Sequence, residues 1–217
     1  MIIHLLRHGE TTWNIERRWQ GSEDSPLTPK GETQIQYLAK HFRHHRAEYI
    51  ISSDLGRAAK TAQVIQAEQD LPLHYSPELR ERSLGIFQGL TRQEIQQRYP
   101  DAFNAWQQDL AHYPIPEGES LSDFYQRCWQ GLLGIYSQAA QQATKELLIV
   151  THGGVIYSLL SQVLGIDIAL TRPMAIPNTS INTLRYDQHE SRWTVMQMGN
   201  IDHLISADGI ESADDLI

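Results

Sequence analysis

Two apolar runs that each deliver a histidine to a glycine-containing turn constrain the fold of this chain more than any other feature. Residues 2–6 lead into Arg7-His8-Gly9-Glu10, and residues 147–150 lead into Thr151-His152-Gly153-Gly154. Short apolar runs bounded by turn residues are typical of buried strands. Open α/β sheets bind ligands where strand ends are followed by helix N-termini. The sequence therefore predicts that His8 and His152 converge at one crevice if their strands are neighbours.

The first of these turns has the composition of a phosphate site. Arg7 supplies a fixed cation, His8 a titratable nitrogen and Gly9 a permissive backbone, while Thr11 and Asn14 add neutral donors. The alternative for this stretch alone is a plain strand-to-loop turn with a solvated arginine and histidine.

Strand-like and helix-like segments alternate along the rest of the chain. Thr28 is placed to cap a helix with Pro29 at its first position, and this helix is expected to end in the cluster His41, His44, His45 and Arg46. The other expected elements are a strand at 49–53, a helix from 54, a long helix from Ser120 to about Gln142, a helix after His152, a loop at 173–180 and a hairpin at 181–187 and 192–198. This order predicts a three-layer α/β/α fold with a mainly parallel central sheet. Residues 202–217 are acidic and weakly apolar, which suits either a frayed tail or a partner-binding arm.

The histidines at 41, 44 and 45 have spacings that metal ligands on a helix also show. No cysteine or aspartate lies beside them in the sequence to complete a site. The pattern therefore favours a solvated helix end whose cations complement the helix dipole, and no metal site is predicted.

Composition excludes several classes of function. The formal net charge of -8 argues against a nucleic-acid or anionic-membrane binder, because such partners require a basic face. The single cysteine, Cys128, lies in a helical pattern and is interpreted as a small core residue. No apolar stretch is long enough for a membrane span, so we expect a cytoplasmic protein, with formation of a homodimer left open.

Two charged residues need an explanation beyond solvation. Arg57 stands near the start of the helix from 54, where a cation opposes the helix dipole. Glu81 lies between Arg80 and Arg82, which on its own would suit a solvated ion-pair surface. From the residues alone, both a structural and a functional role stay open for each.

A helical cap is expected from about Arg92 to Ser120. Thr91-x-x-Glu94 forms a capping box at the start of a helical segment through Arg98, and a second segment runs from Asp101 to Ala111. Their aromatic residues suit a cap over the site and core packing equally well.

The run Arg7-His8-Gly9-Glu10, together with Asn14, resembles the signature of the histidine phosphatase superfamily, which includes the cofactor-dependent phosphoglycerate mutases. Residues 52–62, Ser-Ser-Asp-Leu-Gly-Arg-Ala-Ala-Lys-Thr-Ala, are similar to the second signature of that family, and the likeness extends to about residue 187. The resemblance implies that Arg57 is a phosphate ligand and that Glu81 is the proton donor.

We therefore expect one domain over residues 1–217 that hydrolyses small phosphate esters through a phosphohistidine. His8 is the predicted nucleophile, and Arg7, Arg57 and His152 are predicted to neutralise the phosphoryl oxygens. The predicted substrate-binding residues are Asn14, Gly153, Thr11, Gly21 and Arg82. No cofactor or metal is expected. The alternatives are a phosphoglycerate mutase and a non-catalytic module that binds a phosphorylated ligand.

Overall fold

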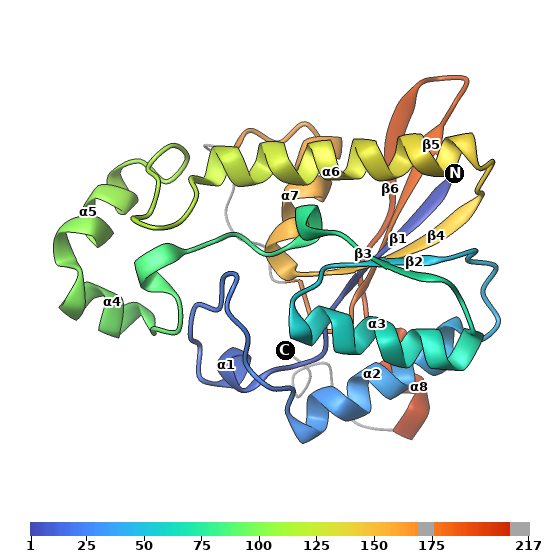
Figure 1. The fold of residues 1–217 in the computed structure, drawn as a ribbon, viewed down its shortest axis with the longest axis horizontal. Coiled ribbons are helices and arrows are strands. Elements are labelled where there is room, and N and C mark those ends of the chain that lie inside the picture. Colours follow the sequence, from blue (N-terminus) through green and yellow to red (C-terminus); the bar gives the residue numbers. More distant parts are fainter. Residues whose placement is uncertain (169–175, 209–217) are drawn as a thin grey trace.

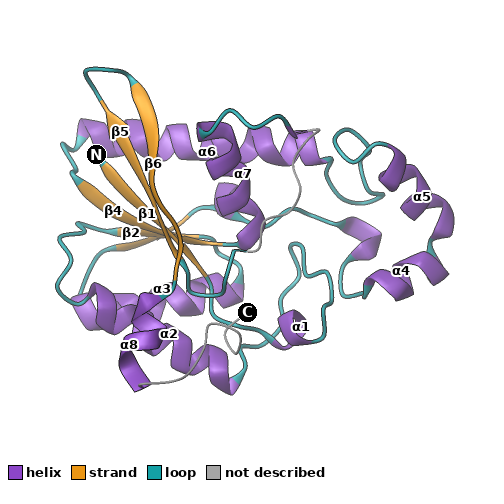
Figure 2. Ribbon diagram, turned by 180° about the vertical axis from the view of Figure 1, so that it is seen from behind, coloured by secondary structure: helices purple, strands orange, loops and turns teal. Residues whose placement is uncertain are grey.

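The computed structural model describes residues 1–168 and 176–208. Its centre is a six-stranded sheet in the order β3-β2-β4-β1-β5-β6. Figure 2 shows the strands between helices on both sides. The parallel part consists of β3 (Leu73–Tyr75), β2 (Ile50–Ser52), β4 (Glu146–Thr151) and β1 (Ile2–Arg7). An antiparallel hairpin of β5 (Ile181–Asp187) and β6 (Arg192–Asn200) extends the sheet beyond β1.

Helices cover both faces of this sheet (Figure 1). One face carries α2 (Pro29–Phe42) and α3 (Gly56–Gln69), and the other carries α6 (Leu121–Gln141) and α7 (Gly153–Val163). A short helix, α1 (Thr12–Ile15), lies in the loop between β1 and α2. The predicted three-layer α/β/α fold is confirmed.

Alternation along the central strands divides the core between the two helical layers. Leu5 and Ile149 pack with the α6 and α7 side, where Cys128 is fully buried as predicted. Leu6 and Leu148 pack on the opposite face with residues of α2 and α3. Successive side chains of a strand point to opposite faces, so a sheet buried on both faces requires the continuous apolar runs seen in the sequence.

Local capping sets the helix starts that the sequence predicted. The Thr28 hydroxyl accepts a hydrogen bond from the Gly31 amide at 2.9 Å, with Pro29 at the first position of α2. The Ser120 hydroxyl accepts one from the Asp123 amide at 3.0 Å and starts α6. Side-chain caps satisfy amides that have no partner inside the helix.

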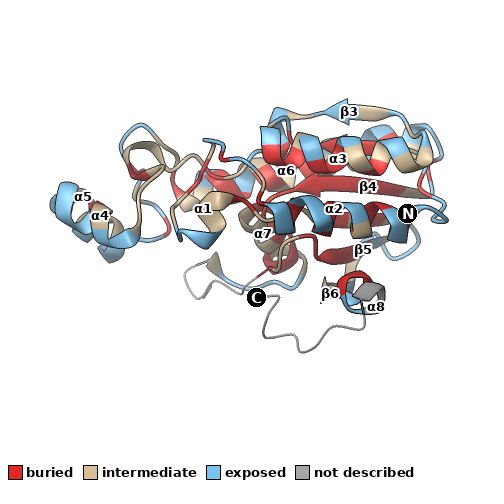
Figure 3. Ribbon diagram, turned by 90° about the horizontal axis from the view of Figure 1, so that it is seen from below, coloured by how far each residue is buried: buried red, intermediate tan, exposed pale blue. Residues whose placement is uncertain are grey.

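The predicted cap contains α4 (Arg92–Arg98) and α5 (Pro100–Gln108), which lie away from the sheet and are largely exposed (Figures 1 and 3). α5 ends three residues before the predicted Ala111. The cap has its own apolar cluster, centred on Phe87, Ile95, Phe103 and Ile115, and Trp19 from the N-terminal region packs against it. The aromatic residues of the cap therefore include core residues of the cap itself.

Other elements were not predicted. They are β3, α1, the 3-10 turns η1 (Pro77–Leu79) and η2 (Gly85–Phe87), and α8 (Asp202–Asp208). The interpretation of residues 202–208 as a frayed tail or arm is wrong, because α8 packs beside α2 and buries His203 and Leu204. Residues 209–217, and 173–175 of the predicted loop, lie outside the described residues.

Among the described residues, no helix combines the length and the apolar character that crossing a membrane would require.

The burial of His203 makes a pH dependence of stability testable. Burial, reinforced by the nearby His41, lowers the pKa of His203 to about 4. The unfolded chain takes up a proton near the ordinary pKa of about 6.5, whereas the folded chain does not, so the free energy of unfolding falls as the pH drops below 6.5. At about 1.4 kcal/mol per pH unit, the expected loss from this residue between pH 6.5 and pH 5 is about 2 kcal/mol. Urea unfolding at both pH values should show that His203→Gln loses about 2 kcal/mol less than the wild type; equal losses would contradict this assignment.

Candidate active site

A pocket of about 310 Å³ lies where β1 and β4 end. These strands pair in parallel with Arg7 opposite Thr151, so the two histidines that follow them emerge side by side. Seven predicted site residues line the pocket: Arg7, His8, Asn14, Gly21, Arg57, Glu81 and Gly153. The predicted convergence of the two strand ends is therefore observed.

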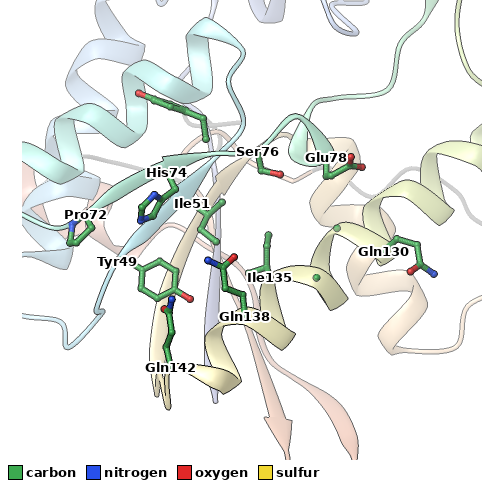
Figure 4. A pocket seen from close by; sticks show the side chains of 13 residues that line it. Tyr49, Ile51, Pro72, His74, Ser76, Glu78, Gln130, Ile135, Gln138 and Gln142 are labelled. Atoms are coloured by element: carbon green, nitrogen blue, oxygen red, sulfur yellow. The ribbon is translucent and has the colours of Figure 1, made fainter.

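A larger groove of about 830 Å³ lies elsewhere, between α6 and the β2–β3 edge of the sheet (Figure 4). Tyr49, His74 and Gln138 are among its lining residues, and none of the predicted site residues belongs to it. The convergence of charged and titratable groups, rather than size, distinguishes the smaller pocket.

His8 is held as a neutral imidazole with one nitrogen available. The side chain is buried, and its Nδ1–H donates to the Gly9 carbonyl oxygen at 2.7 Å. Burial first, and then the guanidinium groups of Arg57 and Arg7, keep the pKa of His8 well below its ordinary value of 6.5. The Nε2 atom therefore carries a lone pair, as a nucleophile requires.

His152 stands against His8, with 5.3 Å between the ring centroids. Its Nε2 is 2.8 Å from the Ser53 hydroxyl, which fixes the plane of the ring. Burial and the cationic surroundings also lower the pKa of His152 well below 6.5. Two neutral imidazoles are thus kept in contact beside two arginines.

Arg57 is positioned by the segment before α2. Its guanidinium donates to the carbonyls of Glu23 at 2.6 Å and Gly21 at 2.8 Å, and to the Asp24 carboxylate at 2.8 Å. The same carboxylate accepts the Gly56 amide at 2.5 Å, at the start of α3. The Asp24 carboxylate therefore supplies a negative charge both to the N-terminus of α3 and to the Arg57 guanidinium, which on its own would oppose the helix dipole.

Arg7 is half-buried beside His8, and this burial lowers the pKa of its guanidinium to about 10, so it remains charged at neutral pH. It donates to the Ile176 carbonyl oxygen. The Nε atoms of Arg7 and Arg57 and the Nδ1 atom of His152 are buried with no hydrogen-bond partner among residues 1–168 and 176–208. Buried polar atoms are rarely left unpaired, so this cluster has the properties of a site prepared for a polar ligand.

Glu81 reaches the pocket from the loop after η1. Its carboxylate accepts hydrogen bonds from the amides of Gly154 and Arg82, both at 2.9 Å. A Cβ atom at Gly154 would overlap this carboxylate, whereas one at Gly153 would make only ordinary contact with Arg7. The second glycine of the turn is therefore required for the approach of Glu81 to the helix start.

Comparison with known proteins agrees with this geometry. The family model described as histidine phosphatase superfamily (branch 1) matches residues 3–200. The chain belongs to the histidine phosphatase superfamily.

Relatives of this histidine phosphatase superfamily member carry two kinds of name. Phosphoglycerate mutase-like protein 4 of Arabidopsis thaliana is 37% identical, over 93% of this chain and 86% of that protein. The structure of Bacillus stearothermophilus YhfR is 33% identical with a TM-score of 0.82, covering 94% of this chain and 98% of the other. A mycobacterial glucosyl-3-phosphoglycerate phosphatase, solved with VO3, is 30% identical with a TM-score of 0.78, covering 92% and 99%.

Three predicted residues lie outside the lining of the pocket of this superfamily member. His152 stands behind the surface, against His8. Thr11 is buried, caps α1 and accepts from the Gln20 amide at 2.8 Å. Arg82 is directed away, because its guanidinium donates to the Glu119 carbonyl at 2.9 Å and 3.1 Å. Thr11 and Arg82 thus have partners within the protein, and their contact with substrate stays a prediction.

The sequence did not single out several residues that complete the site: Gln20, Leu84, Gly154, Tyr157 and Ile176 line the pocket, and Asn178 supports it. The Asn178 side-chain Nδ2 donates to the His8 carbonyl oxygen at 3.0 Å and to the Asn14 Oδ1 atom at 3.3 Å. One signal was present for Tyr157, which follows Gly153 by four residues and so lies on the same helix face. For Asn178, the local sequence carries no signal.

Proposed function

We propose that this protein is a metal-independent phosphomonoesterase that works through a phosphohistidine at His8. The observation that carries the proposal is the neutral, buried His8, whose Nδ1 is committed to Gly9 and whose Nε2 is free among Arg7, Arg57 and His152.

In the first step, His8 Nε2 attacks phosphorus and the ester oxygen departs on the opposite side. Arg7, Arg57 and His152 stabilise the charge on the remaining phosphoryl oxygens, with Asn14 and the Gly153 amide as neutral donors. Glu81 supplies the proton that the departing alkoxide needs. The products of this step are the alcohol and the phosphohistidine.

In the second step, water attacks the phosphohistidine. The Glu81 carboxylate accepts the proton of that water, which restores its starting state, and phosphate leaves with His8 neutral again. One carboxyl group thus acts as acid and then as base, as a two-step covalent mechanism requires.

The donor set at the phosphate supports metal independence. Among the residues that line the described pocket, arginines supply the positive charge, His8 supplies a neutral nitrogen and Glu81 supplies the carboxylate. A Mg²⁺ ion prefers several oxygen ligands, and the charge that it neutralises in kinases is already matched here by two guanidinium groups.

Several arginines outside the phosphate-binding cluster already have partners in the protein, which favours hydrolysis over mutase activity. A mutase must hold a second phosphate and a carboxylate, which requires additional cationic ligands. Arg18 is paired with Glu94 at 2.6 Å and Arg80 with Asp54, while Arg82 is bound to a carbonyl. In the cap, the Arg92 guanidinium lies 5.2 Å from the centre of the Phe103 ring. These groups already have partners inside the protein.

The substrate is proposed to be a small phosphorylated metabolite whose leaving group contacts the cap side of the pocket. The phosphatase name of the mycobacterial relative supports the reaction class, whereas the Arabidopsis name points to the mutase alternative. A cytoplasmic location, the absence of nucleic-acid and membrane partners, and homodimer formation stay predictions.

We expect His8→Ala to abolish both turnover and phosphoenzyme formation, because no other group in the pocket offers a neutral nitrogen nucleophile in that position. Labelled substrate quenched in acid and in alkali should give an acid-labile, base-stable adduct on the wild type and none on the variant. An adduct on serine or aspartate would overturn the mechanism.

We expect Glu81→Gln to slow esters with poor leaving groups much more than activated aryl esters, which depart without protonation. The contrast in kcat/KM should be about a hundredfold or more. Gly154→Ala, which displaces the carboxylate, should reproduce the contrast, whereas Gly153→Ala should not. Equal losses on both substrate classes would leave Glu81 a structural role only.

Turnover should survive incubation with excess EDTA, since the charge at the phosphate is supplied by side chains. A loss of activity that added metal restores would contradict this.

We expect phosphate release from phosphoglycerates to exceed interconversion of the 3- and 2-phosphoglycerate isomers, even when 2,3-bisphosphoglycerate is supplied as a primer. A coupled enolase assay run beside a phosphate assay measures both rates. Mutase turnover well above phosphate release would establish the alternative.

A further inference from the structure

A second titratable cluster lies at the opposite end of the central strands from the active site. It consists of His4 on β1, Glu146 on β4 and His45 in the turn after α2. The His4 Nε2 atom is 3.2 Å from a Glu146 carboxylate oxygen, and the His45 Nδ1 atom is 3.5 Å from the same oxygen. The sequence argued against a metal at His41, His44 and His45 because no cysteine or aspartate lies beside them in the chain. The sheet supplies a carboxylate from a residue 101 positions away.

The spacing of these atoms is that of ligands around one ion. Ligand atoms about 2.1 Å from a tetrahedral zinc lie about 3.4 Å from one another. The two distances of 3.2 Å and 3.5 Å bracket this value, and all three ligand atoms lie within 4.8 Å of one another. The longest of the three separations is that between the ligand nitrogens of His4 and His45. His45 lies outside the regular helix and strands, so a turn of its side chain closes that gap without disturbing the sheet.

His4 is already oriented as a metal ligand. Its other ring nitrogen, Nδ1, is 3.0 Å from the Thr183 hydroxyl on β5. A ligating histidine commonly uses its second ring nitrogen in this way, which fixes the tautomer and aims the remaining lone pair at the ion. Burial is also the largest effect on the pKa of His4 and lowers it, which keeps the ring neutral. His4 and Glu146 are 12% and 18% exposed, so the cluster is shielded yet reachable from solvent.

We propose that His4, His45 and Glu146 form a zinc site with its fourth position open to water. Two imidazoles and a carboxylate are a donor set that zinc accepts. When the ion is bound, the single proton of the neutral His4 ring lies on Nδ1 and is donated to the Thr183 hydroxyl, which leaves the Nε2 lone pair for the ion. The site joins the N-terminal halves of β1 and β4 to the turn that follows α2.

The proposed ion takes no part in phosphate chemistry. Four residues of extended strand separate His4 from His8, a span of about 13 Å. Zinc at this site therefore acts on stability, while turnover is independent of it. This separates the proposal from the metal-independent reaction at His8, and the failure of either leaves the other standing.

Zinc titration of the EDTA-treated and dialysed full chain tests the proposal. Calorimetry should give one zinc per chain, and Co²⁺ at the same site should give the visible absorption of a low-coordinate histidine and carboxylate complex. Zinc should also raise the melting temperature, because an ion that binds only the folded state stabilises it.

Matched variants locate the ion. His45→Gln and Glu146→Gln each remove one ligand and should weaken zinc binding more than about tenfold, whereas His44→Gln, at the exposed neighbouring histidine, should not. Thr183→Val tests the orienting hydroxyl and should weaken binding by about 10- to 100-fold. His8→Ala controls for zinc bound at the active-site histidines and should retain the full signal.

Loss of the signal in His8→Ala with retention in His45→Gln would place the ion at the active site and overturn the proposal. No saturable binding to the wild type, or equal affinity in His44→Gln, His45→Gln and Glu146→Gln, would overturn it as well.

Discussion

The parallel pairing of β1 with β4 is the contact on which the site depends. Its register sets Arg7 opposite Thr151, and the His8 amide extends the ladder by donating to the Thr151 carbonyl at 3.1 Å. One residue of slip would turn each strand-end side chain to the other face of the sheet. The apolar side chains buried on both faces penalise such a slip, so hydrophobic packing far from the pocket fixes the distance between His8 and His152.

Charge is the second constraint. Arg57 is buried and Arg7 is half-buried around two imidazoles, and of these two arginines only Arg57 has a direct ion pair among the described residues, with Asp24. Burying a cation without an anion is costly unless a ligand supplies one. A phosphoryl group relieves that cost and turns a destabilising arrangement into binding energy. The same two arginines, together with burial, lower the pKa values of His8 and His152, because a positive charge nearby disfavours protonation of an imidazole.

The sequence correctly predicted the features of the fold that depend on local patterns of residues. Apolar runs and capping residues predicted the order of the layers and the helix starts, and the contrast of Arg-His-Gly with its surroundings predicted that His8 and His152 lie side by side at the strand ends. It failed where a residue acts through a distant partner. The bond of the Arg82 guanidinium to the Glu119 carbonyl oxygen had no signal in the sequence, and residues 202–208 were not predicted as a helix because the burial of His203 depends on packing against α2. The role of Asn178 depends on a hydrogen bond to a residue 170 positions away, which no local pattern encodes.

The segment before α2 also determines how this architecture can diversify. It carries Asp24 against Arg57, and a few residues earlier it exchanges backbone hydrogen bonds with the base of the cap, from the Trp19 amide to Leu90 and from the Gly89 amide to Trp19. The Trp19 ring lies 5.2 Å from that of Trp106 in α5. One short segment, residues 19–24, thus contacts the cap through Trp19 and the phosphate-site residue Arg57 through Asp24. If a cap from another member of the superfamily replaced this one without the segment 19–24, poor packing against Trp19 would shift Asp24 and hence Arg57. Exchange of specificity between relatives therefore requires changes in two stretches that are distant in sequence.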